Sequence, residues 1–378
     1  WGLRVYRRGG AVVLSDSLPM LEHMGVRVMG EHNHRLLDGE TTVSLHDFEL
    51  RLPAQGWAAE AQPQAVARLF EDAFARVYTG AVDNDDLNRL VLRAGLPADK
   101  VVVLRAYTRY CRQIGFALGQ PTIEAALAAQ PRIARMLVEL FALRFDPAAR
   151  DDAAAAVQAQ SIERALDDVS SLSEDRVLRQ LLGLVQATLR CNHWRTGAGC
   201  SGAAGPRRSF LSLKFDCARV PALPQPRPLY EIYVYSPRFE GVHLRGGRVA
   251  RGGLRWSDRP EDFRTEVLGL VKAQMVKNTV IVPVGAKGGF FVKRPPTDRE
   301  AQQAEGIACY KLFIGSMLDI TDNIVEGRII PPQDVVRHDD DDAYLVVAAD
   351  KGTARFSDIA NGLALEEGFW LGDAFASG

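Results

Sequence analysis

The sequence has few cysteines and no apolar run long enough to cross a membrane. Its five cysteines are scattered without a CxxC spacing, which predicts reduced thiols and neither a disulfide framework nor a zinc site. No apolar stretch approaches the roughly 20 residues that span a bilayer. No signal peptide is visible either, so we expect a cytoplasmic protein. The formal net charge of -1 gives no general attraction to nucleic acid or to an anionic membrane.

What is present is a long chain of globular composition. Its 378 residues are too many for one ordinary hydrophobic core, so we expect two or three domains. The chain begins at Trp1 without a methionine and stops at Gly378, just after an aromatic, apolar segment. We therefore expect it to be a piece of a longer polypeptide.

Residues 1–53 are predicted to form a small α+β unit. Apolar positions alternate in three stretches, which predicts strands, and Ser15 is placed to cap a helix that ends at Gly25. The expected strands span 3–7, 26–31 and 42–50. The order strand, helix, strand, strand is that of half a regulatory ligand-binding module, although unrelated sandwiches share it.

Residues 54–191 are rich in Ala, Leu, Arg and Glu at helical spacing, with Gly and Pro at the joints. The expected helices span 65–78, 85–94, 98–118, 122–145, 149–167 and 173–190. No pattern of buried charge in this region indicates chemistry, so a helical bundle that acts as a scaffold or spacer is expected.

Residues 192–378 alternate strands with helices, which predicts an α/β domain with a mixed sheet. The expected strands span 209–215, 230–235, 247–256, 279–283, 290–292 and 344–348, and the expected helices 261–278, 297–323 and 354–367. The stretch GAKGG at 285–289 is expected to be a turn, and the acidic run 339–342 a solvated loop.

The stretch 251–293 places three cations beside glycines or at a helix end. Arg251 precedes two glycines, Lys277 closes a mostly apolar helix face, and Lys287 lies inside GAKGG. Each has an ordinary explanation: a surface arginine, a lysine that reaches out to water, and a solvated loop lysine. Together they favour a pocket for carboxylates, with one lysine held for acid/base work.

Asp350 follows an apolar strand, at the strand end where open α/β sheets bind ligands. A helix N-cap is the competing interpretation. The glycine pattern at 197–202 is expected to follow a helix and lead into a strand, so we reject it as a dinucleotide fingerprint. His32 and His34 could place two imidazoles on one strand face, but no metal site is predicted there.

Several longer stretches carry a resemblance to a known family. RGGLRWSDRPEDFRTEVLGLVKAQMVKN, PVGAKGGFFVK, LDITDN, YLVVAADKGTA, FSDIAN and FWLGDAFASG resemble the catalytic part of the very large bacterial NAD-dependent glutamate dehydrogenases. Upstream, LSDSLPMLEHMGVRV and LHDFEL resemble that family's last ACT-like regulatory segment, and DDLNRLVLRAGL and LRAYTRYCRQIG its helical region.

The resemblance implies a multidomain protein of α+β and α/β class. It consists of an ACT-like α+β unit in 1–53, a helical bundle in 54–191 and a mixed-sheet α/β substrate-binding domain in 192–378. The resemblance also implies that NAD is bound mainly by a Rossmann domain absent from this chain, so the piece alone is expected to be catalytically silent. A homo-oligomer is expected.

The resemblance further implies a substrate site for L-glutamate or 2-oxoglutarate and ammonia. Arg251, Lys277 and the backbone of Gly253 are expected to hold the carboxylates, and Met275 and Ala348 to line the same site. Arg251 stands where most glutamate dehydrogenases have lysine, and one residue fewer separates Met275 from Lys277 than in their element.

Two further residues match catalytic positions. Lys287 matches the catalytic lysine that activates water and stabilises developing charge, although Val284 replaces the first glycine of that element. Asp350 matches the aspartate that carries protons to and from the amino group. The remaining alternatives are another amino-acid dehydrogenase of the same superfamily and a non-catalytic module that senses amino acids or serves as a scaffold.

Overall fold

The structure is a computed structural model that describes residues 1–38, 41–54, 56, 61–198, 204–207, 209–277, 284–349, 356–372 and 374–375. The chain forms two compact units. The first unit comprises Trp1–Arg105, Gln120–Val138 and Asp168–Leu178, and the second Ala106–Gly119, Glu139–Asp167 and Arg179–Gly378. Within the ranges given, no helix is long and apolar enough to cross a membrane.

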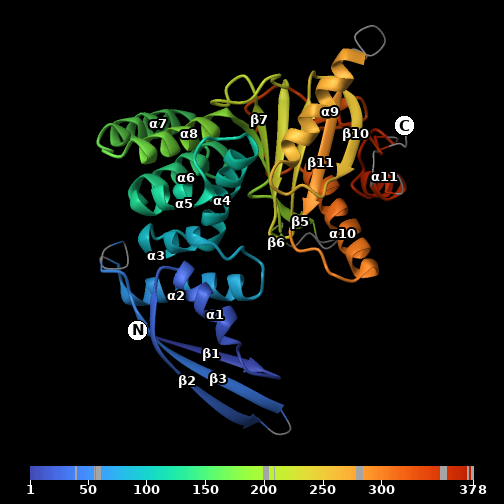
Figure 1. The fold of residues 1–378 in the computed structure, drawn as a ribbon. Helices are drawn as coiled ribbons and strands as arrows, with labels where there is room; N and C mark the ends of the chain where they lie inside the picture. Colours follow the sequence, from blue (N-terminus) through green and yellow to red (C-terminus); the bar gives the residue numbers. More distant parts are fainter. Residues whose placement is uncertain are drawn as a thin grey trace. The chain divides into compact units, whose positions relative to one another are not determined.

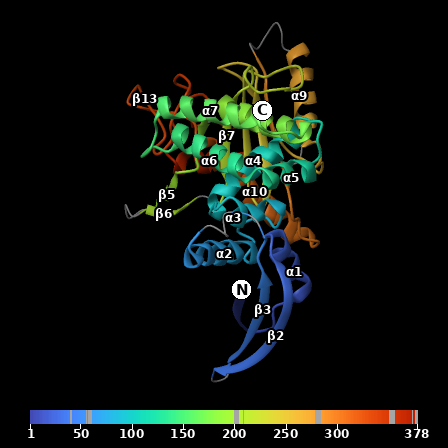
Figure 2. The ribbon, with the colours of Figure 1, turned by 90° about the vertical axis from the view of Figure 1, so that its left-hand side faces the viewer.

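The first unit begins with a three-stranded antiparallel sheet in the order β1-β3-β2, with helix α1 beside it (Figure 2). Its elements are β1 (Gly2–Arg8), α1 (Leu14–His23), β2 (Arg27–Asp38) and β3 (Thr41–Arg51). The predicted order of strand, helix, strand and strand is confirmed, and β2 is longer than expected. The predicted helix cap is wrong, because α1 starts one residue before Ser15 and its N-cap is Val13 without a side-chain hydrogen bond. Gly25 follows the helix at φ +84°, as the sequence indicates.

The helical part of the chain contains α2 (Pro63–Tyr78), the 3-10 turn η2 (Asp86–Arg89), α3 (Leu90–Arg93), α4 (Ala98–Gln113), α5 (Gln120–Ala129), α6 (Pro131–Phe145), α7 (Asp152–Asp167) and α8 (Leu172–Ala187). The single helix predicted over 122–145 is two helices, because Pro131 begins a new helix at the position that tolerates a missing N–H. Buried charge is present: Arg105 donates from Nε and Nη2 to the Asp85 carboxylate at 2.8 Å each, which ties α4 to η2.

The second unit is built on a seven-stranded mixed sheet in the order β14-β10-β11-β9-β8-β7-β4. Its strands are β4 (Thr188–Cys191), β7 (Leu211–Asp216), β8 (Tyr230–Tyr235), β9 (Phe239–Arg245), β10 (Arg251–Trp256), β11 (Ala286–Val292) and β14 (Val346–Ala349). β14, β10 and β11 run parallel and the other neighbours antiparallel, so the predicted mixed sheet is confirmed. The sequence missed β9, because all seven of its residues are buried and no alternation marks it. The described residues also form two small hairpins, β5 (Thr196–Ala198) with β6 (Ala204–Arg207) and β12 (Asn323–Val325) with β13 (Arg328–Ile330).

Helices α9 (Phe263–Lys277), α10 (Arg299–Leu318) and α11 (Ser357–Glu366) accompany this sheet (Figure 1). A side chain at Gly289 would meet Val267 of α9, whereas the next residue, Phe290, packs on Phe313 of α10. Successive strand residues point to opposite faces, so α9 and α10 cover opposite faces of the sheet. α11 joins α10 in a single apolar cluster with β8, β9, β10, β11 and β14.

Four of the cysteines, Cys111, Cys191, Cys217 and Cys309, are buried thiols that form no disulfide among the described residues, as the sequence predicts. Cys200 and the strand expected over 279–283 lie outside the described residues. The sheet of the second unit begins at Thr188, four residues before the expected boundary at 192. The division of the chain at 53 and 191 stays a prediction.

Candidate functional site

Four of the predicted site residues lie on the three strands that run parallel: Arg251, Gly253, Lys287 and Ala348. In the register of β10 with β14, Gly253 is the partner of Ala348. In the register of β10 with β11, Leu254 is the partner of Gly288, which places Lys287 one residue away from that level. Arg251 and Lys287 are 36 positions apart in the sequence, yet Arg251 is the first residue of β10 and Lys287 the second residue of the neighbouring strand β11.

Arg251 and Lys287 also point to one face of the sheet. Lys287 is two residues from Gly289, whose side-chain direction meets Val267 of α9. Arg251 is four residues from Arg255, whose Nη1 donates to Glu266 of α9 at 2.8 Å. Strand side chains alternate, so both cations lie on the α9 face. Arg251 is exposed and Lys287 half-buried, so both can be reached from solvent.

The end of helix α9 closes this corner of the sheet. Gln274 donates from Nε2 to the backbone oxygen of Arg251 at 2.9 Å, and a Cβ on Gly285 would lie 2.5 Å from Gln274 Oε1. Met275 and Lys277 follow Gln274 in the last turn of α9, so their backbone lies beside the start of β10. Gln274 was not predicted as a site residue; its only sequence signal is that it shares a helix face with Lys277.

The turn predicted at 285–289 is wrong, because residues 286–289 are the first part of strand β11. The glycines serve close packing. A Cβ on Gly288 would lie 2.4 Å from Leu254, and one on Gly289 2.7 Å from Val267. On the neighbouring strand, a Cβ on Gly252 would lie 1.3 Å from the backbone oxygen of Ala286. These positions let β10, β11 and α9 approach one another more closely than any other residue would allow.

Asp350, the predicted proton carrier, lies outside the described residues, one position beyond the end of β14. The structure thus places the backbones of Arg251, Gly253, Met275, Lys277, Lys287 and Ala348 around one corner of the sheet. The described residues contain no group of three or more His, Cys, Asp and Glu side chains that could hold a metal ion.

A buried charge network lies on the antiparallel part of the same sheet. We call it the acidic-loop network; its members are Arg190, Lys214, Arg245, Asp322, Asp339 and Asp342. The three cations come from β4, β7 and β9, and two of the carboxylates come from the acidic run 339–342.

Each charge of the network has a close partner. Arg190 donates to Asp322 at 2.9 Å and to Asp339 at 2.6 Å, and Lys214 lies 2.5 Å from Asp339 and 2.6 Å from Asp342. The solvated loop predicted for 339–342 is therefore wrong at both ends of the run. Local sequence could not show it, because the partners come from strands more than 90 positions away.

The network also fixes the approach to β14. Arg245 pairs with Asp342, and its Nη1 donates to the backbone oxygen of Tyr344 at 2.5 Å, two residues before the strand begins. Burial opposes ionisation of Asp342, but Lys214 and Arg245 outweigh it and lower the pKa of Asp342 to about 2. The carboxylate is therefore ionised at neutral pH and holds the segment that leads into β14.

Comparison with known proteins identifies the class of protein to which the chain belongs. Residues 161–378 match the family described as bacterial NAD-glutamate dehydrogenase, catalytic domain. Residues 82–147 match the glutamate dehydrogenase helical motif 3, and residues 1–65 the glutamate dehydrogenase ACT3 domain. The chain belongs to the family of bacterial NAD-glutamate dehydrogenases, as its motifs indicate.

Its relatives include proteins named NAD-specific glutamate dehydrogenase. The one from Halomonas elongata is 52% identical over 379 residues, which cover 100% of this chain and 23% of that protein. The one from Pseudomonas aeruginosa is 54% identical over 386 residues, covering 99% of this chain and 23% of that protein. The one from Mycobacterium tuberculosis is 51% identical, with 98% of this chain and 24% of that protein covered. The chain therefore spans about a quarter of the length of these relatives.

Proposed function

We propose that the full-length protein carrying this chain catalyses NAD-dependent oxidative deamination of L-glutamate to 2-oxoglutarate and ammonia. The observation that carries the proposal is the corner where Arg251 and Lys287 lie at the beginning of adjacent parallel strands, beside the end of α9. Membership of the glutamate dehydrogenase family supplies the reaction that such a corner would serve.

The proposed roles follow from charge and position. Arg251 and Lys277 hold the two carboxylates of glutamate, and the backbone of Gly253 completes the grip, with Met275 and Ala348 lining the same site. A substrate held at both ends presents its α-carbon in a fixed position. Lys287 then activates the water that attacks the imine and stabilises the charge that develops, and Asp350 carries protons to and from the nitrogen.

NAD supplies the hydride acceptor in this proposal. The glycine pattern at 197–202 does not fit its pyrophosphate, because the strands on either side, β5 and β6, pair antiparallel as a hairpin and do not form a strand–turn–helix unit. The residues of the sheet corner fit the substrate. We therefore keep the expectation that NAD is held mainly by residues outside this chain.

We also propose a cytoplasmic homo-oligomer, with an ACT-like segment in 1–53, a helical region in 54–191 and a substrate domain from 192. The matches to the ACT3 domain and to helical motif 3 support the first two segments.

The function is tested by substrate profile on the full-length protein. With NAD, L-glutamate should yield NADH, 2-oxoglutarate and ammonia in equal amounts. L-Norvaline lacks the side-chain carboxylate and should react with a kcat/KM at least about 10³-fold lower, because a site built for a charged group is left unsatisfied. Comparable rates with norvaline would favour a dehydrogenase for apolar amino acids. An absence of NADH with every amino acid would favour a scaffold.

A further inference from the structure

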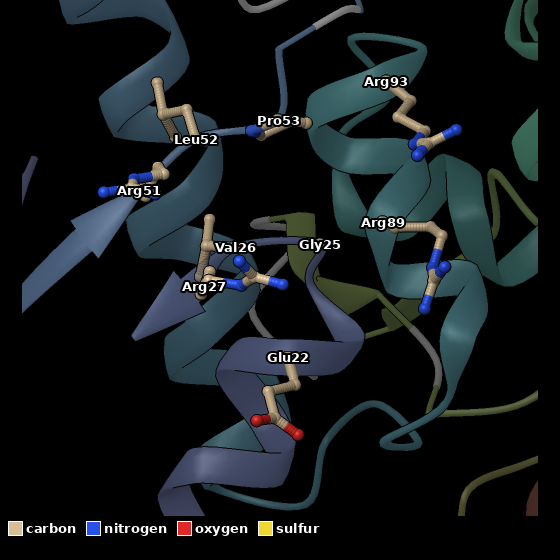
Figure 3. A pocket seen from close by; sticks show the side chains of 9 residues that line it. All are labelled: Glu22, Gly25, Val26, Arg27, Arg51, Leu52, Pro53, Arg89 and Arg93. Atoms are coloured by element: carbon tan, nitrogen blue, oxygen red, sulfur yellow. The ribbon is translucent and has the colours of Figure 1, made fainter. Parts of the chain in front are cut away.

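The first unit contains a cavity of about 360 Å³ whose nine lining residues include four arginines. Figure 3 shows Arg27 and Arg51 on the side of the sheet and Arg89 and Arg93 on the side of η2 and α3. We call it the arginine cavity. Glu22 is the one carboxylate among its lining residues, all of which are described. Its volume lies within the range of sites for small molecules.

The arginines form two pairs of like charges. Arg27 and Arg51 are direct cross-strand partners in β2 and β3, so their side chains leave the same face of the sheet about 5 Å apart. Arg89 and Arg93 are four positions apart across η2 and α3, a spacing that places them on one helical face. Like charges in either arrangement are destabilising. The fold keeps both pairs at one opening.

The protein compensates little of this charge. Arg27 and Arg51 are exposed and form no ion pair with any residue that the structure describes. Arg93 donates to the backbone oxygen of Ala128 at 3.0 Å, a neutral partner. Glu22 forms no ion pair with the four arginines within the described part of the chain, and its carboxylate is turned away from them in Figure 3.

Among the residues that the structure describes, Arg89 is the one arginine of the cavity with a carboxylate partner. It pairs with Asp86, yet its Nε is buried and has no hydrogen-bond partner among the described residues. A buried donor left in this way costs free energy. Arg89 thus adds an unsatisfied donor to the uncompensated charge of the other three.

We propose that the arginine cavity binds a small polyanion that carries at least two carboxylate or phosphate groups. A guanidinium group donates two parallel hydrogen bonds to either group, and Arg is preferred over Lys for that geometry. Each like-charge pair suits one charged group, so a ligand with two such groups bridges the strand side to the helical side. The proposal does not depend on the dehydrogenase activity.

A bridging polyanion would also stabilise the first unit. It would cancel both repulsions and tie the ends of β2 and β3 to η2 and α3 in the bound state only. A ligand that binds only the folded state raises stability in proportion to the logarithm of its concentration. The first unit should therefore unfold at a higher temperature when the cavity is filled.

The test is isothermal titration calorimetry of the full-length protein in low-salt buffer. Pyrophosphate and tricarballylate serve as the phosphate and carboxylate probes, and acetate as a singly charged control. At least one polyanion should bind, and acetate should bind at least about tenfold more weakly because it reaches only one arginine pair. The tighter of the two polyanions identifies the preferred group, and either preference supports the proposal.

Variants assign the binding to this cavity. The double variant Arg27→Gln/Arg51→Gln should weaken binding of the preferred polyanion by at least about tenfold. Arg93→Gln should weaken it from the other wall. Arg35→Gln removes an exposed arginine of β2 that does not line the cavity, and it should bind like the unaltered protein. Failure of both polyanions to bind, or equal affinity in the double variant and Arg35→Gln, would overturn the proposal.

Discussion

Two regions of this chain contain several cations, and they differ in how far carboxylates of the protein pair with them. In the acidic-loop network, three buried cations meet three carboxylates at hydrogen-bond distance. In the arginine cavity, four arginines share an opening with one carboxylate that pairs with none of them. A buried charge needs a partner within the fold, whereas water solvates an exposed charge, which stays available to a ligand.

The difference separates structural from functional charge. The network is complete without a ligand and fixes the segment that leads into β14. The cavity is solvated and incomplete in itself, which is the condition of a binding site. The corner with Arg251 and Lys287 is also open to solvent, since Arg251 is exposed and Lys287 half-buried on one face of the sheet.

The largest effect on stability is expected from Arg190→Ala. It would leave Asp322 and Asp339 buried beside a lost partner, which should cost on the order of 3–5 kcal/mol of unfolding free energy. The change in unfolding free energy is measured from the first unfolding transition in a urea titration of the full-length protein. The matched variant Arg35→Ala lies on an exposed strand face and should change stability by less than about 0.5 kcal/mol. If Arg190→Ala changed the unfolding free energy as little as Arg35→Ala, the network would not have the structural role assigned to it.

Acid should act on the sheet of the second unit and not on the arginines. His243 of β9 is buried, and burial, together with nearby Arg245, lowers its pKa to about 3. In the unfolded chain the pKa of His243 returns to about 6.5, so acid protonates the unfolded chain before the folded protein. The stability that depends on neutral His243 is therefore fully present above pH 6.5. That stability falls as the pH drops from 6.5 toward 3, by on the order of 5 kcal/mol.

Melting temperatures across this pH range test the contribution of His243. His243→Gln should flatten the loss between pH 6.5 and 3. A second loss should follow between about pH 4 and pH 2, where Asp342 takes up a proton, because its pKa is lowered in the fold to about 2. An unchanged slope in His243→Gln would show that other groups control the acid response.

The smallest effect is expected from Arg51→Gln without any polyanion. Removing one member of the pair with Arg27 relieves a direct cross-strand repulsion, so stability should stay level or rise by about 0.2–1 kcal/mol. The gain should shrink in high salt, which screens exposed charges. A clear loss of stability in Arg51→Gln would mean that this arginine has a structural role and would weaken the contrast with Arg190.

The sequence predicted the elements well where pattern is local. The alternation in 3–7, 26–31 and 42–50 gave the first sheet, and the strands and helices of the second unit were largely placed. The prediction failed where contacts with residues distant in the sequence determine the structure. β9 is buried on both faces and shows no alternation. GAKGG contributes to a strand, and its glycines allow β10 and α9 to pack closely against it.

For the candidate site, too, the sequence predicted what motifs mark and missed what distant contacts determine. Family motifs pointed to Arg251 and Lys287, and the strand register brings them together. Gln274 and the acidic-loop network were missed, because their partners are 23 to more than 90 positions away and no local pattern marks the contact. Side-chain pairing of this kind depends on the fold and cannot be deduced from spacing.

The most direct test of the proposed site is steady-state glutamate oxidation by the full-length Lys287→Ala variant. Loss of the acid/base lysine should lower kcat by about 10³-fold, with KM for glutamate changed only a few-fold because Arg251 and Lys277 remain. Lys311→Ala, an exposed lysine on α10, should keep full activity. A kcat for Lys287→Ala within tenfold of the unaltered protein, with a preserved fold, would contradict the catalytic role of this strand.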